Sequence, residues 1–183
     1  EIAGGLSAAY GAYLLSIKEN SGGVPELTKK LEQIAQKYPA VESLADAGSW
    51  VIFGGGVAGR KALELALKIK ARVSVVETNP DRRRELAENP KIQALSPEND
   101  LLRVVSEADL MIGCAHSLGK KAVLVIHQDL LAQASGKKKK VMMDIAIDQG
   151  GNFPGARSTT YADPVYRDEF GNLRFSVPNI PSF

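Results

Sequence analysis

Residues 50–59 read WVIFGGGVAG, in which four apolar residues run directly into a glycine loop. Three glycines of this loop have the spacing G-x-G-x-x-G between a strand pattern and a helix pattern. In that context Gly54 permits a tight turn, Gly56 lets the backbone approach a pyrophosphate, and Gly59 lets the helix pack close to the strand. The free N–H groups and the dipole of the helix N-terminus attract phosphate as well. The predicted phosphate-binding residues are Gly54, Gly56, Val57, Ala58 and Gly59.

An acidic residue follows the loop at the distance that a dinucleotide site requires. Residues 73–76 form a second apolar run, which ends at Glu77, about 20 residues beyond the loop. A carboxylate there accepts hydrogen bonds from the adenosine ribose and repels a 2′-phosphate, so NAD is favoured over NADP. Three arginines, Arg82 to Arg84, leave an alternative open, because an arginine beside the ribose can bind that phosphate. Their other interpretation is the exposed first turns of a helix that begins near Pro80.

The chain around this loop alternates short apolar runs with helical patterns. Apolar strands are predicted at residues 50–53, 73–76, 92–95, 110–114 and 141–145. Strands that are apolar throughout and joined by helices are buried on both faces. The predicted fold class is therefore α/β, a Rossmann-type doubly wound parallel sheet with helices on both faces.

The N-terminal part has a different pattern. Residues 2–17 carry apolar side chains at spacings of three and four among small residues, and Pro25 can begin a second helix. We therefore predict a helical hairpin within residues 1–47 that packs on a single Rossmann unit, residues 48–183. Because the first helix is apolar and rich in glycine, it needs a covering surface, which predicts a homo-oligomer.

The C-terminal part is richer in glycine, proline and asparagine from residue 150 onward. Short strand-like pieces occur near Tyr161, Val165 and residues 174–177. We predict an irregular segment that folds back over the edge of the sheet.

The charge of the chain is nearly balanced, with 23 basic and 21 acidic residues and a formal net charge of +2. This balance predicts no nucleic-acid partner and no membrane surface. The longest basic run, Lys137 to Lys140, is interpreted as a solvated loop before a buried strand. No apolar run reaches the roughly 18 residues of a membrane span, and no signal-peptide pattern opens the sequence, so a cytoplasmic location is predicted.

One cysteine, Cys114, lies in an apolar run and is predicted to be a buried structural thiol, which excludes an internal disulfide. No spacing of Cys, His, Asp or Glu is typical of a metal site, so no metal cofactor is predicted. The reaction chemistry is therefore expected to come from the bound dinucleotide.

The segment VMMDIAIDQGG, residues 141–151, ends a strand with a carboxylate, an amide and two glycines. Ligands bind at this carboxyl edge in open α/β sheets. The segment resembles the D-x-A-I-D-Q-G-G signature of alanine dehydrogenases and of the NAD-binding part of proton-translocating transhydrogenases. The resemblance covers about residues 1–20 and 48–183 and is closer to the alanine dehydrogenase branch. Further stretches that carry it are residues 54–59, 108–113, 157–164 and 177–181.

The resemblance implies roles for individual residues. Asp148 matches the active-site aspartate that lies beside the nicotinamide and the substrate, and Glu77 matches the acid that binds the adenosine ribose. Asn179 and Ile180 match residues that contact the cofactor near its nicotinamide end. A purely structural role in a strand-end turn is an equal alternative for Asp144, Gln149 and Gly150.

The family places its substrate-binding arginine and lysine and its catalytic histidine in a separate N-terminal domain, which is not found in these 183 residues. A helix near residues 25–38 and an end at Phe183 are further departures from the family pattern. They predict a trimmed piece of a longer enzyme or a stand-alone version of the domain. His116, in the loop after the fourth strand, is the candidate to replace the missing histidine. His127 is interpreted as a capping or surface residue.

Three functions stay open at this point, because a Rossmann sheet serves many chemistries. The first is the NAD(H)-binding domain of an alanine-dehydrogenase-like oxidoreductase, which deaminates a small amino acid reversibly to its oxo acid. The second is a non-catalytic NAD-binding module or subunit. The third is a transhydrogenase-like component that docks on another nucleotide-binding domain.

Overall fold

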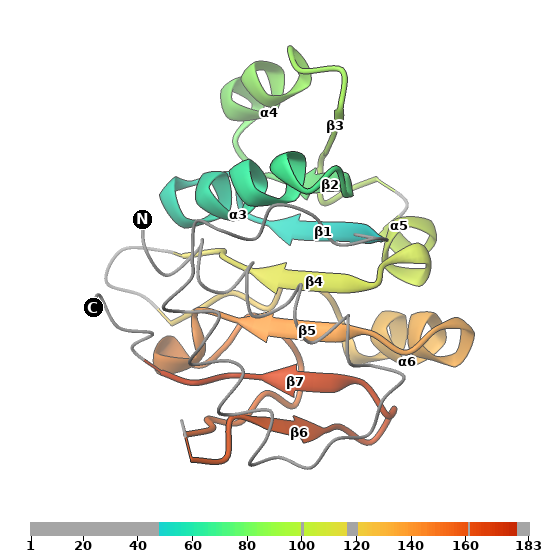
Figure 1. The fold of residues 1–183 in the computed structure, drawn as a ribbon, viewed down its shortest axis with the longest axis vertical. Helices are drawn as coiled ribbons and strands as arrows, with labels where there is room; N and C mark the ends of the chain where they lie inside the picture. The colour runs from blue at the N-terminus through green and yellow to red at the C-terminus, as the bar shows by residue number, and fades with distance from the viewer. Residues whose placement is uncertain (1–47, 100, 117–120, 161, 179–183) are drawn as a thin grey trace.

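The computed structural model describes residues 48–99, 101–116, 121–160 and 162–178 (Figure 1). The predicted helical hairpin at residues 1–47 and the strand-like piece at Tyr161 lie outside the described residues. The division of the chain at residue 48 therefore stays a prediction. One sheet of seven strands carries the part of the fold that the structure describes.

Five parallel strands form the predicted core of this sheet. They are β1 (Ser49–Phe53), β2 (Arg72–Val76), β3 (Ile92–Leu95), β4 (Leu110–Gly113) and β5 (Val141–Asp144). Their order is β3-β2-β1-β4-β5, and each pairs in parallel with its neighbours. Every residue of β4 and β5 is buried, as expected for strands that are covered on both faces. The predicted Rossmann-type sheet is confirmed.

Helices cover both faces of the sheet, as predicted (Figure 1). One core joins Trp50 and Ile52 of β1 with two helices, α3 and α4. A second core joins Val51 and Phe53 with α5 and α6, because successive side chains of a strand point to opposite faces. The bounds are α3 (Val57–Lys68), α4 (Pro80–Ala87), α5 (Leu101–Glu107) and α6 (Gln128–Lys137), with a short 3-10 helix, η1 (Ile147–Gln149).

Helix α4 begins where the sequence supplies a capping residue. The side chain of Asn79 accepts hydrogen bonds from the backbone N–H groups of Asp81 (2.9 Å) and Arg82 (3.0 Å). Pro80 occupies the first helical position, where its missing N–H is harmless. This cap sets the direction in which the chain leaves β2, and it brings the arginines of α4 to the end of that strand.

The C-terminal tail extends the sheet with two short strands. The strand-like pieces near Val165 and residues 174–177 are therefore confirmed, whereas the prediction of an irregular segment over the sheet edge is wrong. β7 (Leu173–Phe175) pairs in parallel with β5, and β6 (Val165–Arg167) pairs antiparallel with β7 as the last strand. The turn between them is held by the buried carboxylate of Asp168. It accepts hydrogen bonds from Nδ2 of Asn172 (3.1 Å) and Nε of Arg174 (2.8 Å). Buried polar partners of this kind order the hairpin although its sequence pattern is irregular.

One lysine of the basic run is buried, which corrects the prediction of a solvated loop. Lys140 is only 1% exposed. Its Nζ donates hydrogen bonds to the backbone carbonyls of Ser106 (3.4 Å), Ala134 (3.2 Å) and Lys138 (2.8 Å). These carbonyls belong to the C-terminal ends of α5 and α6, which attract positive charge. The buried ammonium therefore connects the C-terminal ends of α5 and α6 just before β5 begins.

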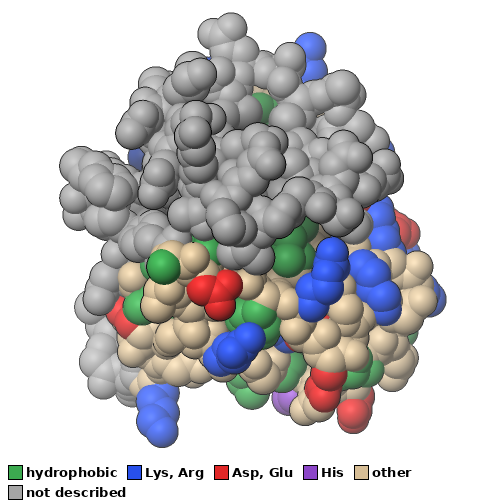
Figure 2. Space-filling model, turned by 60° about the horizontal axis from the view of Figure 1, so that its bottom comes forward, with side chains coloured by type: hydrophobic (Ala, Val, Ile, Leu, Met, Phe, Trp, Pro, Cys, Tyr) green, Lys and Arg blue, Asp and Glu red, His purple; other side chains and the backbone are tan. Residues whose placement is uncertain are grey.

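The described surface carries charges of both signs. Figure 2 shows basic and acidic side chains interspersed on one face of the molecule. Within the described ranges, no helix has the length and apolarity needed to cross a membrane. The same residues hold no group of three or more Cys, His, Asp or Glu side chains arranged for a metal ion.

We expect Lys140→Met to lower the free energy of unfolding by about 2–3 kcal/mol, because buried carbonyls lose their charged donor. Lys137→Met is the matched control, since Lys137 is exposed, and it should stay within about 0.5 kcal/mol of wild type. Urea unfolding followed by circular dichroism measures both values. Equal stability of the two variants would show that the buried ammonium contributes nothing.

Candidate cofactor site

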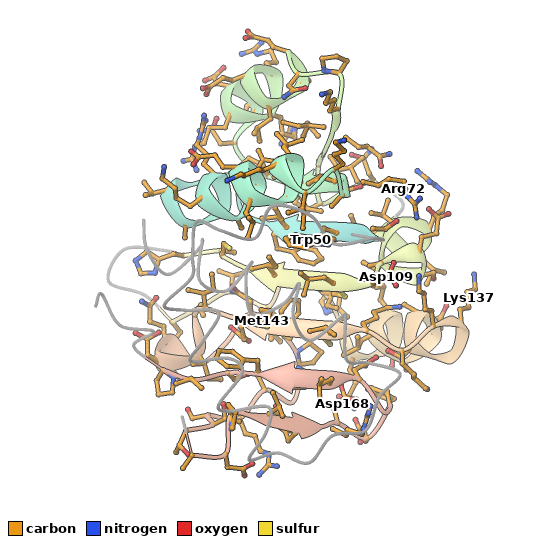
Figure 3. The ribbon with its side chains drawn as sticks, viewed as in Figure 1. Trp50, Arg72, Asp109, Lys137, Met143 and Asp168 are labelled. Atoms are coloured by element: carbon orange, nitrogen blue, oxygen red, sulfur yellow. The ribbon has the colours of Figure 1, made fainter. Side chains whose placement is uncertain are left out.

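The candidate site lies at the carboxyl edge of the sheet. The chain leaves β1 towards β2 and leaves β4 towards β5, so a topological switch point separates these two central strands. The glycine loop follows β1, Glu77 follows β2, and Asp148 follows β5, so these predicted site residues all lie at this edge. Figure 3 shows Arg72, Asp109 and Lys137 at the opposite edge, where the strands begin.

Two of the three motif glycines, Gly54 and Gly59, are required because the backbone packs closely around them. Gly54 has a φ of +101°, and a Cβ there would lie 2.9 Å from the carbonyl oxygen of Cys114. A Cβ at Gly59 would lie 1.8 Å from the carbonyl oxygen of Gly54. Helix α3 can start this close to the strand end only with glycine at that position. The geometry agrees with the predicted roles of these residues in the turn and in helix packing.

Gly56 faces open space instead. A Cβ at this position would have one atom within 4 Å, the Nη1 of Arg82 at 3.9 Å. Among the described residues no side chain caps α3 at Gly56, and Val57, the next residue, is 62% exposed. The N–H groups at the start of α3 are therefore available to an anion, together with the positive end of the helix dipole. The residues present fit the pyrophosphate of a dinucleotide.

Glu77 is tied to the glycine loop. Its carboxylate is buried, and Oε2 accepts hydrogen bonds from the N–H of Gly55 (2.8 Å) and from Nη1 of Arg82 (3.3 Å). Oε1 accepts from the N–H of Asn79 (2.8 Å) and from the hydroxyl of Thr78 (3.2 Å). Burial opposes ionisation, but the hydrogen bonds and the nearby guanidinium together lower the pKa of Glu77 below its usual value. Glu77 is therefore an anion at neutral pH.

The three arginines of α4 have different partners. Arg83 donates a hydrogen bond to the carbonyl oxygen of Glu77 (2.7 Å), and Arg84 forms an ion pair within α4. The contacts of these two arginines stabilise the first turns of α4, in agreement with their interpretation as helix residues rather than as ligands of a 2′-phosphate. Arg82, with a side chain that is 45% exposed, borders both Glu77 and Gly56.

The loop after β4 brings Cys114 and His116 to the same edge. The N–H of Cys114 donates to the carbonyl oxygen of Phe53 (2.8 Å) and joins the ends of β4 and β1. Cys114 is half-buried rather than fully buried as predicted, and it packs against the apolar core. Removal of its thiol from water, and to a smaller extent the charge of Asp144, raises the pKa of the Cys114 thiol to about 12, so the thiol is unreactive at neutral pH. His116 is exposed, and its role in proton transfer stays a prediction. His127 is exposed before α6 and makes no capping hydrogen bond with its side chain.

The loop after β5 is organised by Asp144. This buried carboxylate accepts hydrogen bonds from the backbone N–H groups of Ala146 (3.2 Å), Asn152 (2.8 Å) and Phe153 (3.2 Å). Burial raises the pKa of Asp144, although these hydrogen bonds oppose the shift. The geometry favours the structural interpretation of this residue. Asp148 lies between the two ends of the loop, in η1, and is exposed.

Gln149 and Gly150 have structural tasks as well. Gly150 ends η1 with a φ of +110°, a left-handed conformation that glycine adopts readily. The carbonyl oxygen of Gln149 accepts a hydrogen bond from the N–H of Ala122 at 2.9 Å. The backbone of this turn therefore also supports the structural alternative.

Asn152 lies inside this edge, although no sequence pattern predicted a role for it. Its side chain is fully buried and bonds to the backbone of Ala115 in the loop after β4. Its signal in the sequence is weak, a single polar residue between two glycines and Phe153. The two predicted contacts at the nicotinamide end, Asn179 and Ile180, lie outside the described residues.

A parallel sheet with a glycine loop at its switch point and an ionised acid at the end of β2 defines a dinucleotide-binding domain of the Rossmann type. A family model described as Alanine dehydrogenase/PNT, C-terminal domain matches residues 30–183, and the chain belongs to this family. Domains of this family bind NAD(H). The chain is therefore the NAD-binding domain of an alanine dehydrogenase or transhydrogenase-like protein.

Individual relatives agree with this assignment. Alanine dehydrogenase 1 of Staphylococcus aureus (strain NCTC 8325 / PS 47) is 36% identical over 185 residues, which cover 98% of this chain and 46% of that protein. A solved L-alanine dehydrogenase matches with a TM-score of 0.77 at 29% identity, over 98% of this chain and 46% of that one. A solved transhydrogenase from Sinorhizobium meliloti has a TM-score of 0.64 at 19% identity, over 96% and 48% of the two chains, and shares the fold. The chain spans about half the length of these relatives.

We expect Gly56→Val to weaken NADH binding by about tenfold or more, because its side chain occupies the space that the pyrophosphate needs. The melting temperature should change little, since the added Cβ meets open space. Gly136→Ala in α6 is the control, because nothing lies within 4 Å of its added Cβ, and it should bind NADH like wild type. Normal binding by Gly56→Val in a fluorescence titration would mean that the phosphate loop is assigned wrongly.

Proposed function

We propose that this chain is the cofactor half of an alanine-dehydrogenase-like oxidoreductase, which interconverts a small amino acid and its oxo acid. The observation that carries the proposal is the convergence of three features at one edge of the sheet. They are the open backbone at Gly56, the ionised carboxylate of Glu77 and the exposed carboxylate of Asp148. The similarity to alanine dehydrogenase 1 supports the substrate class.

In this proposal the groups of the chain bind and orient the cofactor. The N–H groups at the start of α3 hold the pyrophosphate beside Gly56, and Glu77 binds the adenosine ribose. NAD(H) supplies the hydride chemistry when it is bound. Asp148 lies on the other side of the switch point and is proposed as the active-site carboxylate. Asn179 and Ile180 stay predicted contacts for the nicotinamide end.

The proposed preference for NAD over NADP rests on Glu77. Its carboxylate already accepts four hydrogen bonds, so a ribose hydroxyl has to replace one of the donors. Arg82 is the donor we propose to leave, because its bond is the longest, at 3.3 Å, and its side chain is partly exposed. The remaining negative charge then repels a 2′-phosphate.

A non-catalytic NAD-binding module is the second candidate function. The open backbone at Gly56 and the ionised carboxylate of Glu77 support this candidate equally, because both features serve cofactor binding alone. In the first proposal a further domain or chain supplies the groups that bind the substrate. A homo-oligomer and a cytoplasmic location stay predictions under either proposal.

Calorimetric titration of the 183-residue chain with NADH, followed by pyruvate and ammonium with nicotinamide absorbance recorded, tests the proposal. We expect NADH to bind and its absorbance to stay constant, because these 183 residues span only about half the length of the relatives. Joining the chain to that half should start NADH oxidation, and Asp148→Asn should then slow it without changing NADH affinity. Turnover by the chain alone would point to a local group such as His116, and failure to bind NADH would contradict the proposal.

We expect Glu77→Gln to weaken NADH binding by about tenfold, because an amide nitrogen replaces one acceptor oxygen among several donors. Glu85→Gln is the matched control, since Glu85 is exposed and pairs with Arg60 at the surface. Fluorescence titrations of both variants measure the difference. A wild-type affinity in Glu77→Gln would remove this residue from the ribose site.

The same variant tests the ionisation of Glu77 through stability. A carboxyl group whose pKa is lowered by folding stabilises the fold above its unfolded pKa and loses this contribution as the pH falls through its folded pKa. The pKa of Glu77 is lowered from 4.5, so wild type should exceed Glu77→Gln in stability at pH 7. The difference should shrink below pH 4.5. A difference that is constant from pH 7 to pH 3 would contradict the assigned ionisation.

A further inference from the structure

Asn152 joins the two loops that border the second half of the site. Its side chain is fully buried and makes three hydrogen bonds. Oδ1 accepts from the N–H of Ala115 (3.1 Å), and Nδ2 donates to the carbonyl oxygens of Ala115 (2.9 Å) and Val123 (2.9 Å). The side-chain amide therefore binds both the N–H and the carbonyl oxygen of Ala115, and it also binds the carbonyl oxygen of Val123.

The backbone of β4 makes room for this side chain. A Cβ at Gly113, the last residue of β4, would lie 2.7 Å from the Cβ of Asn152 and 2.9 Å from its Oδ1. Only glycine at the end of β4 therefore allows Asn152 to reach Ala115.

The loop after β5 is anchored at both ends, and Asn152 is one of the anchors. The carboxylate of Asp144 accepts the N–H of Ala146 near the start of this loop and the N–H of Asn152 at its end. Asp148 lies between these two positions. A displacement of Asn152 would consequently displace the segment that carries Asp148.

Two backbone hydrogen bonds complete the connection between the loops. The N–H of Ala122 donates to the carbonyl oxygen of Gln149, and the N–H of Val125 donates to the carbonyl oxygen of Asn152, both at 2.9 Å. Together with the side-chain bonds they connect the described parts of the two loops, residues 114–116 with 121–125 and residues 145–152.

We propose that Asn152 is a positioning residue, which holds the loop after β4 against the loop of Asp148 and so shapes the surface for the nicotinamide half of NAD(H). The inference rests on the proposed function of the carboxyl edge. A dinucleotide lies across the switch point, and its pyrophosphate and adenosine are assigned to the ends of β1 and β2. The other half then extends over the ends of β4 and β5, where Asn152 joins the loops.

The test compares the affinities of NADH and ADP in the 183-residue chain. ADP carries the adenosine and two phosphates but no nicotinamide. Asn152→Ala is expected to weaken NADH binding by about tenfold and to leave ADP binding within about twofold, because only the support of the nicotinamide side is lost. A general loss of structure would weaken both ligands alike.

Asn172→Ala is the matched control. Asn172 is also 0% exposed, and its side chain also makes three hydrogen bonds, to the N–H of Lys140, to Ser135 and to Asp168. It lies at the opposite edge of the sheet, beside Asp168 (Figure 3). We expect this variant to lower the melting temperature about as much as Asn152→Ala while keeping the wild-type ratio of the two affinities.

The outcomes separate the inference from the proposed function. If wild type binds NADH and Asn152→Ala keeps the wild-type ratio of NADH to ADP affinity, the positioning role alone is overturned. The same follows if Asn172→Ala changes this ratio as much as Asn152→Ala does. Wild type that does not bind NADH would overturn the proposed function and the inference with it. If Asn152→Ala does not fold, Asn152→Ser, whose hydroxyl can restore one bond, should change the ratio in the same direction. An unchanged ratio in that variant would contradict the inference.

Discussion

The close approach of helix α3 to the end of β1 is the constraint on which the rest of the site depends. A Cβ at Gly59 would lie 1.8 Å from the carbonyl oxygen of Gly54, so α3 begins this near the sheet only because residue 59 is a glycine. The same turn passes beside Cys114 in the loop after β4 and thereby brings the two sides of the switch point together. A wider turn would move the open N–H groups of α3 away from Glu77 and would separate the phosphate position from the ribose position.

Two buried carboxylates order the loops on either side of that switch point. Glu77 accepts the backbone N–H groups of Gly55 and Asn79 at the end of β2, and Asp144 accepts three backbone N–H groups in the loop after β5. Their environments differ in one respect that concerns function. The guanidinium of Arg82 touches Glu77, whose pKa is lowered, whereas burial dominates at Asp144, whose pKa is raised. Of the two carboxylates, Glu77 has the lowered pKa and contacts the partly exposed side chain of Arg82, so it is the one suited to bind a ligand.

The features that sequence analysis predicted have local signals, and those that it missed have distant partners. The apolar strands and the glycine loop follow from periodicity and spacing within a few residues, and the structure confirms the strands. Lys140 was misinterpreted because its carbonyl partners include Ser106, 34 residues away, at a helix end that only the folded chain brings near. Asn152 was missed because its partner Ala115 is 37 residues away. The strand-like pieces of β6 and β7 are visible in the sequence, but their addition to the sheet is not, because it depends on the buried pair of Asp168 and Arg174.

Binding of NAD(H) across the carboxyl edge of this sheet can be followed in a nitrogen–proton correlation spectrum of the labelled chain titrated with NADH. We expect large shifts for the backbone amides of Gly55, Gly56 and Val57 and for the amide of Ala115 across the switch point. Amides at the opposite edge, such as those of Arg72 and Lys140, should keep their positions. Shifts confined to the opposite edge, or no shifts at saturating NADH, would contradict cofactor binding at the carboxyl edge.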